Sequence, residues 1–465
     1  MRYWATFFVF WLLSPSFAQQ KNIQLLDHWF TDTLVTANSS QVRFSSCWGF
    51  TWDGKEYGVI GSTEGAHFFE LSAADTFRFV DFVPGRFASA QAITREYKHY
   101  QHYVYASCDE GPSSLQIIDI STLPDSVHVV ADLQDAWFGK SHNLFVDSAN
   151  ALLYLTLVTP IVNSIELSKV PMRVYSLQNP TQPQLLWEGP QDIPEVHDVY
   201  VRNNIAVLNC GFDGIRVYDF SNPSQPIYKS NLTVYPHQGY NHQGWLSPDG
   251  STYVFADETA GLPLKKAEVL SNWNLQIVGY FQTENTPYPK TPHNVQLDAH
   301  FAFVSYYNDG LRIFDYTCQP VREVAYFDTY QDGPLTNNYS MWGAWGVHAL
   351  LPSQRILISD RNNGFFLFRF NRALFETPAA ADFTLYPNPS ESGFSVRSPE
   401  DALTDFTVDL FDLNGKLLCS NRIKNQSVYG FEAPLANGVY VVRIHWMDEF
   451  GDMQFKHIRW EKIGS

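Results

Sequence analysis

Short apolar runs bounded by turn residues follow one another along most of the chain, and two segments match over their full length. Residues 293–317 contain a histidine, an apolar strand, an Asn-Asp-Gly turn and a second strand that ends on an aspartate. Residues 197–221 repeat this pattern without a gap, including the Asp-Gly turn and the arginine two residues after it. Asp-Gly supplies the positive φ angles that a tight hairpin needs, so each segment predicts a β-hairpin.

Seven such strand pairs are predicted, at residues 48–71, 91–120, 142–177, 197–221, from 242 past 258, 293–317 and 345–370. A proline-containing turn and one more strand follow several of them, so a unit has about four strands. Four-stranded units that repeat about every 50 residues are typical of a β-propeller. We therefore predict an all-β chain with a seven-bladed β-propeller at residues 19–371, with six or eight blades as alternatives.

The two ends of this region predict how the ring closes. The seventh strand pair has no fourth strand after it, and residues 23–31 have the pattern of one. We expect this N-terminal strand to be the outer strand of the last blade, which removes an exposed sheet edge. Residues 372–382 are predicted to be a linker, and the short alternating strands of 383–465 predict a small Ig-like β-sandwich.

Residues 1–18 have the pattern of a secretory signal peptide. One arginine precedes an apolar run at residues 4–13, and small residues precede a cleavage site after Ala18. The apolar run is too short to span a membrane, and no other stretch comes close to a membrane-spanning length.

Composition narrows the range of partners. Hydrophobic residues make up 45% of the chain and aromatic residues 16%, while charged residues are only 17%, as in a β-rich protein with wide packed faces. The net charge of −17 argues against nucleic acid and anionic membrane surfaces as partners. Five scattered cysteines without a CxxC motif argue against a disulfide scaffold or a cysteine zinc site.

Four histidines are the main candidates for a binding site: His142, His197, His242 and His293 each stand where an inner strand begins. Around a ring, their imidazoles would converge near one mouth of the channel, where they could bind a shared ligand or a metal ion. The alternative is that each histidine ties its blade to the next one, because His293 shares its strand face with apolar residues. Both interpretations remain open at this stage.

Asp257 and Glu258 are candidates to join the histidines at a divalent cation. Adjacent residues on a strand point to opposite faces, so both reach one ion only at a bend, and bonding within or between blades is the alternative. His348 is left out of the set, because alignment of the last unit places Val347 opposite His142. No other cofactor is indicated. The Trp-Gly pairs at 48–49 and 345–346 are expected to pack the rim, or alternatively to stack on a sugar.

Recognised catalytic motifs are absent from the sequence. It has no GxSxG, no HExxH, no Walker loop and no cysteine–histidine signature. We therefore assign no catalytic residue, and the question of enzymatic activity stays open.

The C-terminal segment, residues 383–465, resembles the type A sorting domain of the type IX (Por) secretion system of Bacteroidetes. The residues that carry the resemblance lie in three short motifs: Tyr386, Pro387, Asn388 and Pro389; Asn414 and Gly415; and Asn437, Gly438 and Tyr440. The resemblance implies passage to the periplasm, recognition by the outer-membrane machinery, and release or attachment at the cell surface.

Most of residues 25–370 resembles the LVIVD-repeat propellers, and in particular the proteins called choice-of-anchor B. The motifs that carry this resemblance are Trp-Gly at 48–49 and 345–346, Ser-His-Asn-Leu-Phe at 141–145, Asn-His-Gln-Gly-Trp at 241–245 and His-Asn-Val at 293–295. The resemblance implies a propeller joined to a C-terminal anchor, and it brings no established activity with it.

Three functions are compatible with these observations. The first is a secreted or cell-surface module that binds an unknown extracellular ligand and contacts the secretion machinery through residues 383–465. The second is an extracellular metal-assisted hydrolase with its site at the channel mouth. The third is a structural component of the cell surface or of adhesion.

Overall fold

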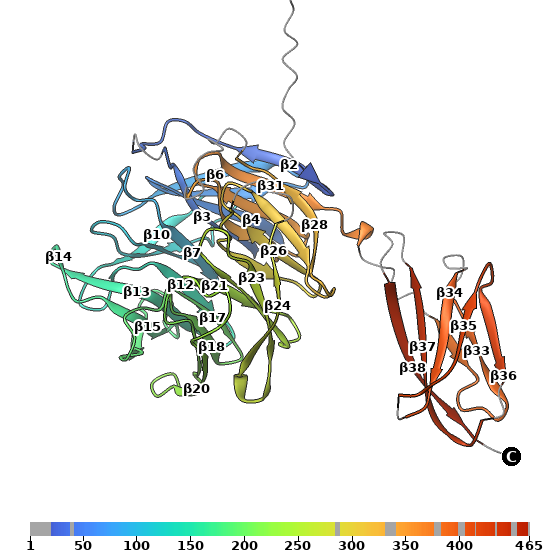
Figure 1. Ribbon diagram of the computed structural model, residues 1–465. Coiled ribbons are helices and arrows are strands. Elements are labelled where there is room, and N and C mark those ends of the chain that lie inside the picture. Colours follow the sequence, from blue (N-terminus) through green and yellow to red (C-terminus); the bar gives the residue numbers. More distant parts are fainter. Residues whose placement is uncertain are drawn as a thin grey trace, which may run out of the picture. The chain divides into compact units, whose positions relative to one another are not determined.

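The computed structural model describes residues 20–37, 41–283, 289–330, 341–375, 383–398, 405–413, 415–432, 435–447 and 453–463. Within these residues the fold is all-β apart from two short 3₁₀ turns, Ser271–Trp273 and Arg372–Leu374 (Figure 1). The chain divides into two compact units, residues 1–371 and 372–465, which are described separately. The predicted signal peptide at residues 1–18 lies outside the described residues.

The described residues of the first unit form seven antiparallel sheets built on four strands each. The first sheet is β3 (Phe44–Trp52), β4 (Lys55–Ser62), β5 (Gly65–Leu71) and β6 (Phe77–Pro84), and the second is β7 (Arg95–Tyr100), β8 (Tyr103–Cys108), β9 (Leu115–Asp119) and β10 (His128–Leu133). The third is β12 (Asn143–Asp147), β13 (Leu152–Val162), β15 (Val170–Ser176) and β16 (Gln184–Glu188), with β11 (Gly139–Lys140) and β14 (Ile165–Glu166) paired to β13.

The remaining sheets repeat this arrangement. The fourth is β17 (Asp198–Arg202), β18 (Ile205–Asn209), β19 (Ile215–Asp219) and β20 (Ile227–Leu232), and the fifth is β21 (Asn241–Leu246), β22 (Thr252–Asp257), β23 (Leu264–Val269) and β24 (Leu275–Phe281). The sixth is β25 (Val295–Leu297), β26 (Phe301–Ser305), β27 (Leu311–Asp315) and β28 (Arg322–Phe327), with β1 (Gln20–Lys21) at its edge. The seventh is β29 (Ala344–His348), β30 (Arg355–Asp360), β31 (Gly364–Phe370) and β2 (Ile23–Trp29).

Strand β2 lies near the N-terminal end of the unit's sequence, whereas the other three strands of the seventh sheet lie at its C-terminal end. It pairs antiparallel with β31, from Ile23 opposite Phe370 to Trp29 opposite Phe365. The pairing predicted for residues 23–31 is therefore confirmed. Because β31 is followed in the chain by the second unit, this fourth strand could only come from a distant segment.

The predicted Asp-Gly turns depend on glycine for a steric reason. Gly214 and Gly310 have φ angles of 74° and 77°, in the left-handed region that side chains rarely adopt. A Cβ at Gly310 would lie 2.1 Å from the carbonyl oxygen of Phe327, and one at Gly214 would lie 2.4 Å from that of Leu232. Glycine thus allows the fourth strand of each sheet to run close to the turn.

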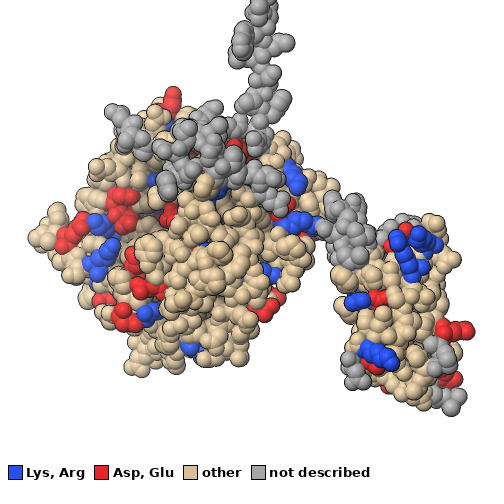
Figure 2. Space-filling view, in the orientation of Figure 1, with Lys and Arg blue, Asp and Glu red and all other residues tan. Residues whose placement is uncertain are grey.

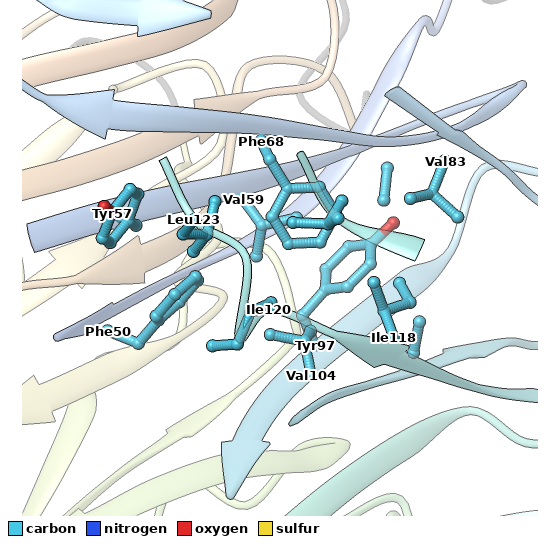
Figure 3. Packing of buried hydrophobic residues seen from close by; sticks show 13 residues of the cluster. Phe50, Tyr57, Val59, Phe68, Val83, Tyr97, Val104, Ile118, Ile120 and Leu123 are labelled. Atoms are coloured by element: carbon cyan, nitrogen blue, oxygen red, sulfur yellow. The ribbon is translucent and has the colours of Figure 1, made fainter. Parts of the chain in front are cut away.

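The hydrophobic core lies between neighbouring sheets. In one cluster, Phe50 and Phe68 of the first sheet pack against Tyr97, Val104 and Ile118 of the second, and all five are at most 2% exposed (Figure 3). Similar clusters join the second sheet to the third and so on to the sixth, and another joins the seventh to the first. Phe301 and Phe327 of the sixth sheet contact Phe370 and Phe368 of the seventh. The inner strands of each sheet therefore bury both faces, which explains why they are continuous apolar runs.

The first strands of the sheets follow one another around a closed path. Contacts run from β3 to β7, β12, β17, β21, β25 and β29, and from β29 back to β3. Residues from all seven of these strands line a cavity of about 30 Å³, which is large enough for one or two water molecules. The first strands thus surround a narrow central channel.

The second unit consists of two sheets. One is β32 (Thr384–Tyr386), β33 (Gly393–Arg397) and β36 (Val428–Glu432), and the other is β34 (Phe406–Phe411), β35 (Leu417–Ile423), β37 (Gly438–Met447) and β38 (Met453–Lys462). Trp460 is fully buried between them, with its ring 4.9 Å from that of Phe394.

The predicted sorting motifs stabilise this unit locally. Asn388 donates to the carbonyl of Arg459 (2.7 Å) and accepts from the backbone of Glu461 (3.0 Å), which attaches the first motif to the last strand. Tyr440 donates to the carbonyl of Ala436 (2.8 Å). Asn414 lies outside the described residues.

Candidate functional site

Antiparallel pairing brings the start of each first strand beside the end of the second strand. Asn241 pairs with Asp257 in the fifth sheet, and Ala344 pairs with Asp360 in the seventh. Residues that begin a first strand and residues that directly follow a second strand therefore meet at one rim of each sheet. Because the first strands surround the channel, these rims together form one channel mouth.

The four predicted histidines form a continuous row along this mouth. The ring centroids of His142 and His197 are 4.2 Å apart, those of His197 and His242 are 4.3 Å apart, and those of His242 and His293 are 4.2 Å apart. Trp345 extends the row, with its ring 4.1 Å from that of His293. We call these five residues the histidine row.

The position of Trp345 corrects the sequence alignment, which placed Val347 opposite His142. The backbone N–H of Gly346 donates to Oγ of its pairing partner Ser359, as that of Asn143, directly after His142, donates to Oγ1 of its partner Thr156. Trp345 therefore occupies the histidine position, and Val347 lines the channel interior. His348 lies away from the row, with its ring 4.4 Å from that of Trp48.

Each of three histidines ties its sheet to the next through Nδ1. This nitrogen donates to the backbone carbonyl of the following member of the row: from His197 to His242 (3.1 Å), from His242 to His293 (3.1 Å) and from His293 to Trp345 (2.7 Å). The geometry of a tie between blades is therefore present. It occupies only one of the two ring nitrogens, so it does not exclude a second role for Nε2.

These three imidazoles are uncharged near neutral pH. Burial, aided by the charge of neighbouring histidines, holds the pKa values of His197 and His293 well below their usual range. Burial also lowers the pKa of His242, although Glu258 opposes the shift. With Nδ1 carrying the proton that the carbonyl accepts, Nε2 carries the lone pair.

His142 differs from the other three because its partner is a carboxylate. Its Nδ1 lies 2.8 Å from Oδ2 of Asp109, which directly follows β8. Burial alone would lower the pKa of His142, but the hydrogen bond and charge of Asp109, with Glu96 and Asp198 further away, raise it. His142 and Asp109 thus form a coupled acid–base pair at the end of the row.

Asp257 and Glu258 point in opposite directions. The carboxylate of Asp257 is fully buried, 2.9 Å from Nζ of Lys265, and accepts hydrogen bonds from Tyr235 and the backbone of Gly239. Glu258 instead faces the histidine row. The structure therefore places Asp257 in a buried ion pair and only Glu258 at the mouth.

The carboxylate of Glu258 lies between the side chains of Tyr307 and His242. Its Oε1 accepts a hydrogen bond from Tyr307, and its Oε2 lies 3.8 Å from Nε2 of His242. Among the described residues, the ligand atoms of His197, His242 and Glu258 all lie within 4.8 Å of one another, so these three side chains are able to hold a metal ion together.

Several mouth residues were not singled out from the sequence. Arg361 directly follows β30, as Glu258 directly follows β22, and Tyr307 is the second residue after β26. Burial, then the charges of Glu195, Glu258 and Asp109, raise the pKa of Tyr240. Glu258, Tyr307 and Arg361 all lie just after the second strand of a sheet. This shared place in the sequence repeat could have identified Tyr307 and Arg361.

Several carboxylates lie at the mouth. Over the face shown in Figure 2, acidic and basic side chains are interspersed on a larger uncharged surface. At the mouth, four carboxylates (Asp109, Glu110, Glu195 and Glu258) influence the ionisation of Tyr240 or Arg361. Burial lowers the pKa of Arg361, whose guanidinium lies 4.1 Å from the ring of Trp345.

Deeper in the channel lies a second charged group. Glu96, Lys98 and Asp198 line the cavity, and Asn143 donates a hydrogen bond to Asp198. Burial is the main cause that raises the pKa of Asp198 to about 7 and that of Glu96, and lowers that of Lys98. The charges of these three side chains compensate one another inside the ring. The cavity there has no room for a ligand larger than water.

Comparison with protein families accounts for the second unit. Residues 384–451 match the model of the secretion system C-terminal sorting domain. The protein is therefore secreted across the outer membrane, to the cell surface or the extracellular space, and its C-terminal domain interacts with the type IX machinery. No LVIVD-repeat or choice-of-anchor B model matches the chain. None of the helical segments in the described residues could cross a membrane.

Comparison with solved structures concerns the fold. A protein from Lactobacillus plantarum is similar with a TM-score of 0.50 and 14% identity, covering 84% of this chain and 99% of its own. An extracellular domain from B. thetaiotaomicron has a TM-score of 0.47 and 11% identity, covering 94% of this chain and 60% of its own. The structural neighbours are β-propeller-like. No curated protein matches the chain.

Proposed function

We propose that the first unit is a seven-bladed β-propeller of the LVIVD-repeat, choice-of-anchor B type, which acts outside the cell as a binding module for a positively charged ligand. Support for the propeller comes from the seven four-stranded sheets, the apolar clusters between them and the return of first-strand contacts from β29 to β3. In this arrangement β2 closes the ring by completing the last blade.

The observation that carries the binding role is the channel mouth. Neutral imidazoles, which offer Nε2 lone pairs, lie beside four carboxylates and one guanidinium. In a partly buried site, such an excess of negative charge attracts cations more strongly than it would in bulk water. The same surroundings disfavour an anionic ligand.

Export is tested by deleting residues 383–465. We expect the truncated protein to stay in the periplasm, because the sorting domain carries the contact with the secretion machinery. The full-length Glu258→Gln variant is the matched control, since it alters the mouth and leaves the sorting domain intact. Normal export of the truncated chain would contradict this part of the proposal.

Binding is tested by calorimetric titration of the exported protein with three cationic probes: Zn²⁺, Ca²⁺ and spermidine. We expect at least one of them to bind saturably and to lose affinity in the Glu195→Gln/Glu258→Gln double variant, which removes two negative charges from the mouth. The Glu166→Gln variant is the control, because Glu166 is an exposed carboxylate of β14. If no probe binds, the binding role is wrong.

Metal-assisted hydrolysis is a second candidate function, favoured by the pairing of His142 with Asp109. A histidine whose Nδ1–H donates to a carboxylate can take a proton from water through Nε2. The test is turnover of phosphoester, lactone and glycoside substrates. Hydrolysis that is lost in both His142→Asn and Asp109→Asn would support this function, and its absence from all three substrate classes would exclude it for them.

A further inference from the structure

We infer that His197, His242 and Glu258 form a binding site for one divalent metal ion of the zinc type at the channel mouth. This inference rests on the proposed function and makes it more specific, because it names the cation and its ligands. The observation that carries it is the approach of two imidazole nitrogens and one carboxylate oxygen to within 4.8 Å of one another.

The two imidazoles are held in the orientation that metal binding needs. Nδ1 of His197 and of His242 each donates to a backbone carbonyl of the next sheet, at 3.1 Å in both cases. In metal sites, a ligating histidine usually donates its other N–H to a carbonyl or carboxylate, which fixes the ring and its tautomer. The ties between sheets thus also orient both Nε2 atoms.

The carboxylate is oriented in a comparable way. Tyr307 donates to Oε1 of Glu258, which leaves Oε2 as the oxygen on the side of His242. Tyr307 is itself buried, at 1% exposure, and packs edge-on against His293 at 5.1 Å. All three ligand groups are therefore held in place by the surrounding protein.

The distance between Nε2 of His242 and Oε2 of Glu258 fits two ligands of one metal ion better than it fits a hydrogen bond. At 3.8 Å it is longer than a hydrogen bond, which spans roughly 2.7–3.2 Å. Two ligand atoms on a tetrahedral zinc ion, at bond lengths of about 2.1 Å, lie about 3.4 Å apart. An ion between these two atoms needs them to move together by only a few tenths of an ångström, and His197 has to approach further, because separations within the group extend to 4.8 Å.

The donor set selects the class of ion. Two imidazole nitrogens and one carboxylate oxygen favour zinc and its transition-metal neighbours, whereas calcium and magnesium are bound mainly by oxygen. Three protein ligands leave a fourth tetrahedral position, as in the sites where zinc keeps a water or a substrate. The ring of His142 lies next to His197, on the side away from His242.

The inference is tested on the exported full-length protein after dialysis against a chelator. Zn²⁺ is titrated calorimetrically, and Co²⁺ is titrated with detection of its visible absorption, which reports coordination geometry. We expect one ion per chain. His197→Asn, His242→Asn and Glu258→Gln should each weaken binding by more than about 100-fold, since even changes in outer-shell partners cost about 10–100-fold.

The variants are chosen to keep the fold. An asparagine amide can replace Nδ1–H as donor to the neighbouring carbonyl and lacks Nε2, and Glu258→Gln retains the acceptor for Tyr307. His293→Asn is the matched control, because His293 makes the same kind of tie, to Trp345 at 2.7 Å, and lies outside the three-residue group. It should bind Zn²⁺ within about tenfold of the wild type.

Each outcome separates this inference from the proposed function. Absence of stoichiometric Zn²⁺ binding, or equal weakening by His293→Asn and His242→Asn, overturns the metal site. If spermidine binds at the mouth and Zn²⁺ does not, the metal site is wrong and the binding module stands. If neither binds, both are wrong. Should a histidine variant fail to fold by circular dichroism, Glu258→Gln still decides, since it removes no bond between sheets.

Discussion

Neighbouring sheets are held together in two different ways on the two sides of the ring. On the histidine side, from the fourth to the seventh sheet, an imidazole Nδ1 donates to a backbone carbonyl of the next sheet. On the arginine side, Arg95 donates to the carbonyls of Ser62 and Thr63, and Arg355 binds Glu56 at 2.8 Å. We use these two names for the two sides below.

The two sides differ in the hydrogen-bonding groups that remain unused on the arginine or histidine side chain after it has bonded to the next sheet. A guanidinium has donors and no acceptor, whereas a neutral imidazole that donates through Nδ1 retains a lone pair on Nε2. Both side chains hold sheets together. Of these ties, those of the histidine side alone leave a lone pair that a cation can use, which is a chemical capacity that the architecture does not require.

The largest expected effect concerns ring closure, on which both sides depend. Deleting β2, Ile23–Trp29, removes the outer strand of the seventh sheet and uncovers β31 and part of the cluster between the seventh and first sheets. We expect loss of the cooperative unfolding transition and aggregation, measured by circular dichroism and size-exclusion chromatography. Deletion of residues 20–22 is the control, because it removes β1 and leaves β2 intact. Cooperative unfolding without β2 would contradict the closure.

The next effect tests the arginine side. Arg355→Met leaves the carboxylate of Glu56 without its ion pair at 9% side-chain exposure, so it should lower the free energy of unfolding by about 3–5 kcal/mol in urea denaturation. Arg369→Met is the matched control: Arg369 is 47% exposed and pairs with Asp75, so its loss should cost less than about 1 kcal/mol. Equal costs for the two variants would show that the buried pair does not stabilise this side.

A pH effect separates two aspartates at the same strand position, one in the fifth sheet and one in the seventh. Asp257 ends β22 beside Lys265, whereas Asp360 ends β30 with hydroxyl and backbone N–H donors and no lysine in contact among the described residues. Burial raises the pKa of Asp360 from 3.8 to about 6, although hydrogen bonds from Thr329 and the backbone oppose the shift. The folded protein therefore holds a proton that the unfolded chain releases.

This aspartate should make stability fall as pH rises. Between about pH 3.8 and pH 6 the folded state binds more protons than the unfolded state, so the contribution is complete below pH 3.8 and lost above pH 6. Asp360→Asn removes this dependence. Between pH 4 and pH 7, the free energy of unfolding of this variant should rise relative to that of the wild type by about 2.4 kcal/mol, at about 1.36 kcal/mol per pKa unit. A constant difference between the two proteins across this range would show that Asp360 ionises normally.

The smallest effect tests a tie on the histidine side. His293→Ala removes one of the two donors to the buried carbonyl of Trp345, the other being Oγ of Ser305 at 2.5 Å, so it should cost about 0.5–1.5 kcal/mol in urea denaturation. His293→Asn should recover most of this loss, because its amide can donate to the same carbonyl. If the alanine and asparagine variants were equally destabilised, packing of the ring rather than the hydrogen bond would hold the two sheets together.

Much of this architecture could be predicted from local sequence patterns. Period-two and continuous apolar runs indicate strands, and Gly214 and Gly310 occupy turns with positive φ that the Asp-Gly pattern signals. The fourth strand supplied by residues 23–31 also followed from the pattern. The register of β29 did not, because only its pairing with β30, Gly346 opposite Ser359, shows which residue stands at the histidine position.

The candidate site was predictable only in part, for a physical reason. The histidines share one position in each repeat, so their convergence follows from repetition alone. The groups around them come from different sheets: Asp109 follows β8, Glu258 follows β22 and Tyr307 follows β26. Each lies in a turn whose composition looks ordinary, and only the packing of neighbouring sheets brings these turns to one rim.

The sequence by itself determined the strand pairs, their fifty-residue spacing, the sorting domain and the recurrence of histidine where inner strands begin, because these depend on neighbouring residues. Only the tertiary structure decided that Glu258 faces the mouth while Asp257 pairs with Lys265. It also decided that Nδ1 of His197 and His242 is the nitrogen engaged in the ties. These outcomes depend on atoms supplied by the adjacent sheet, which no local pattern encodes.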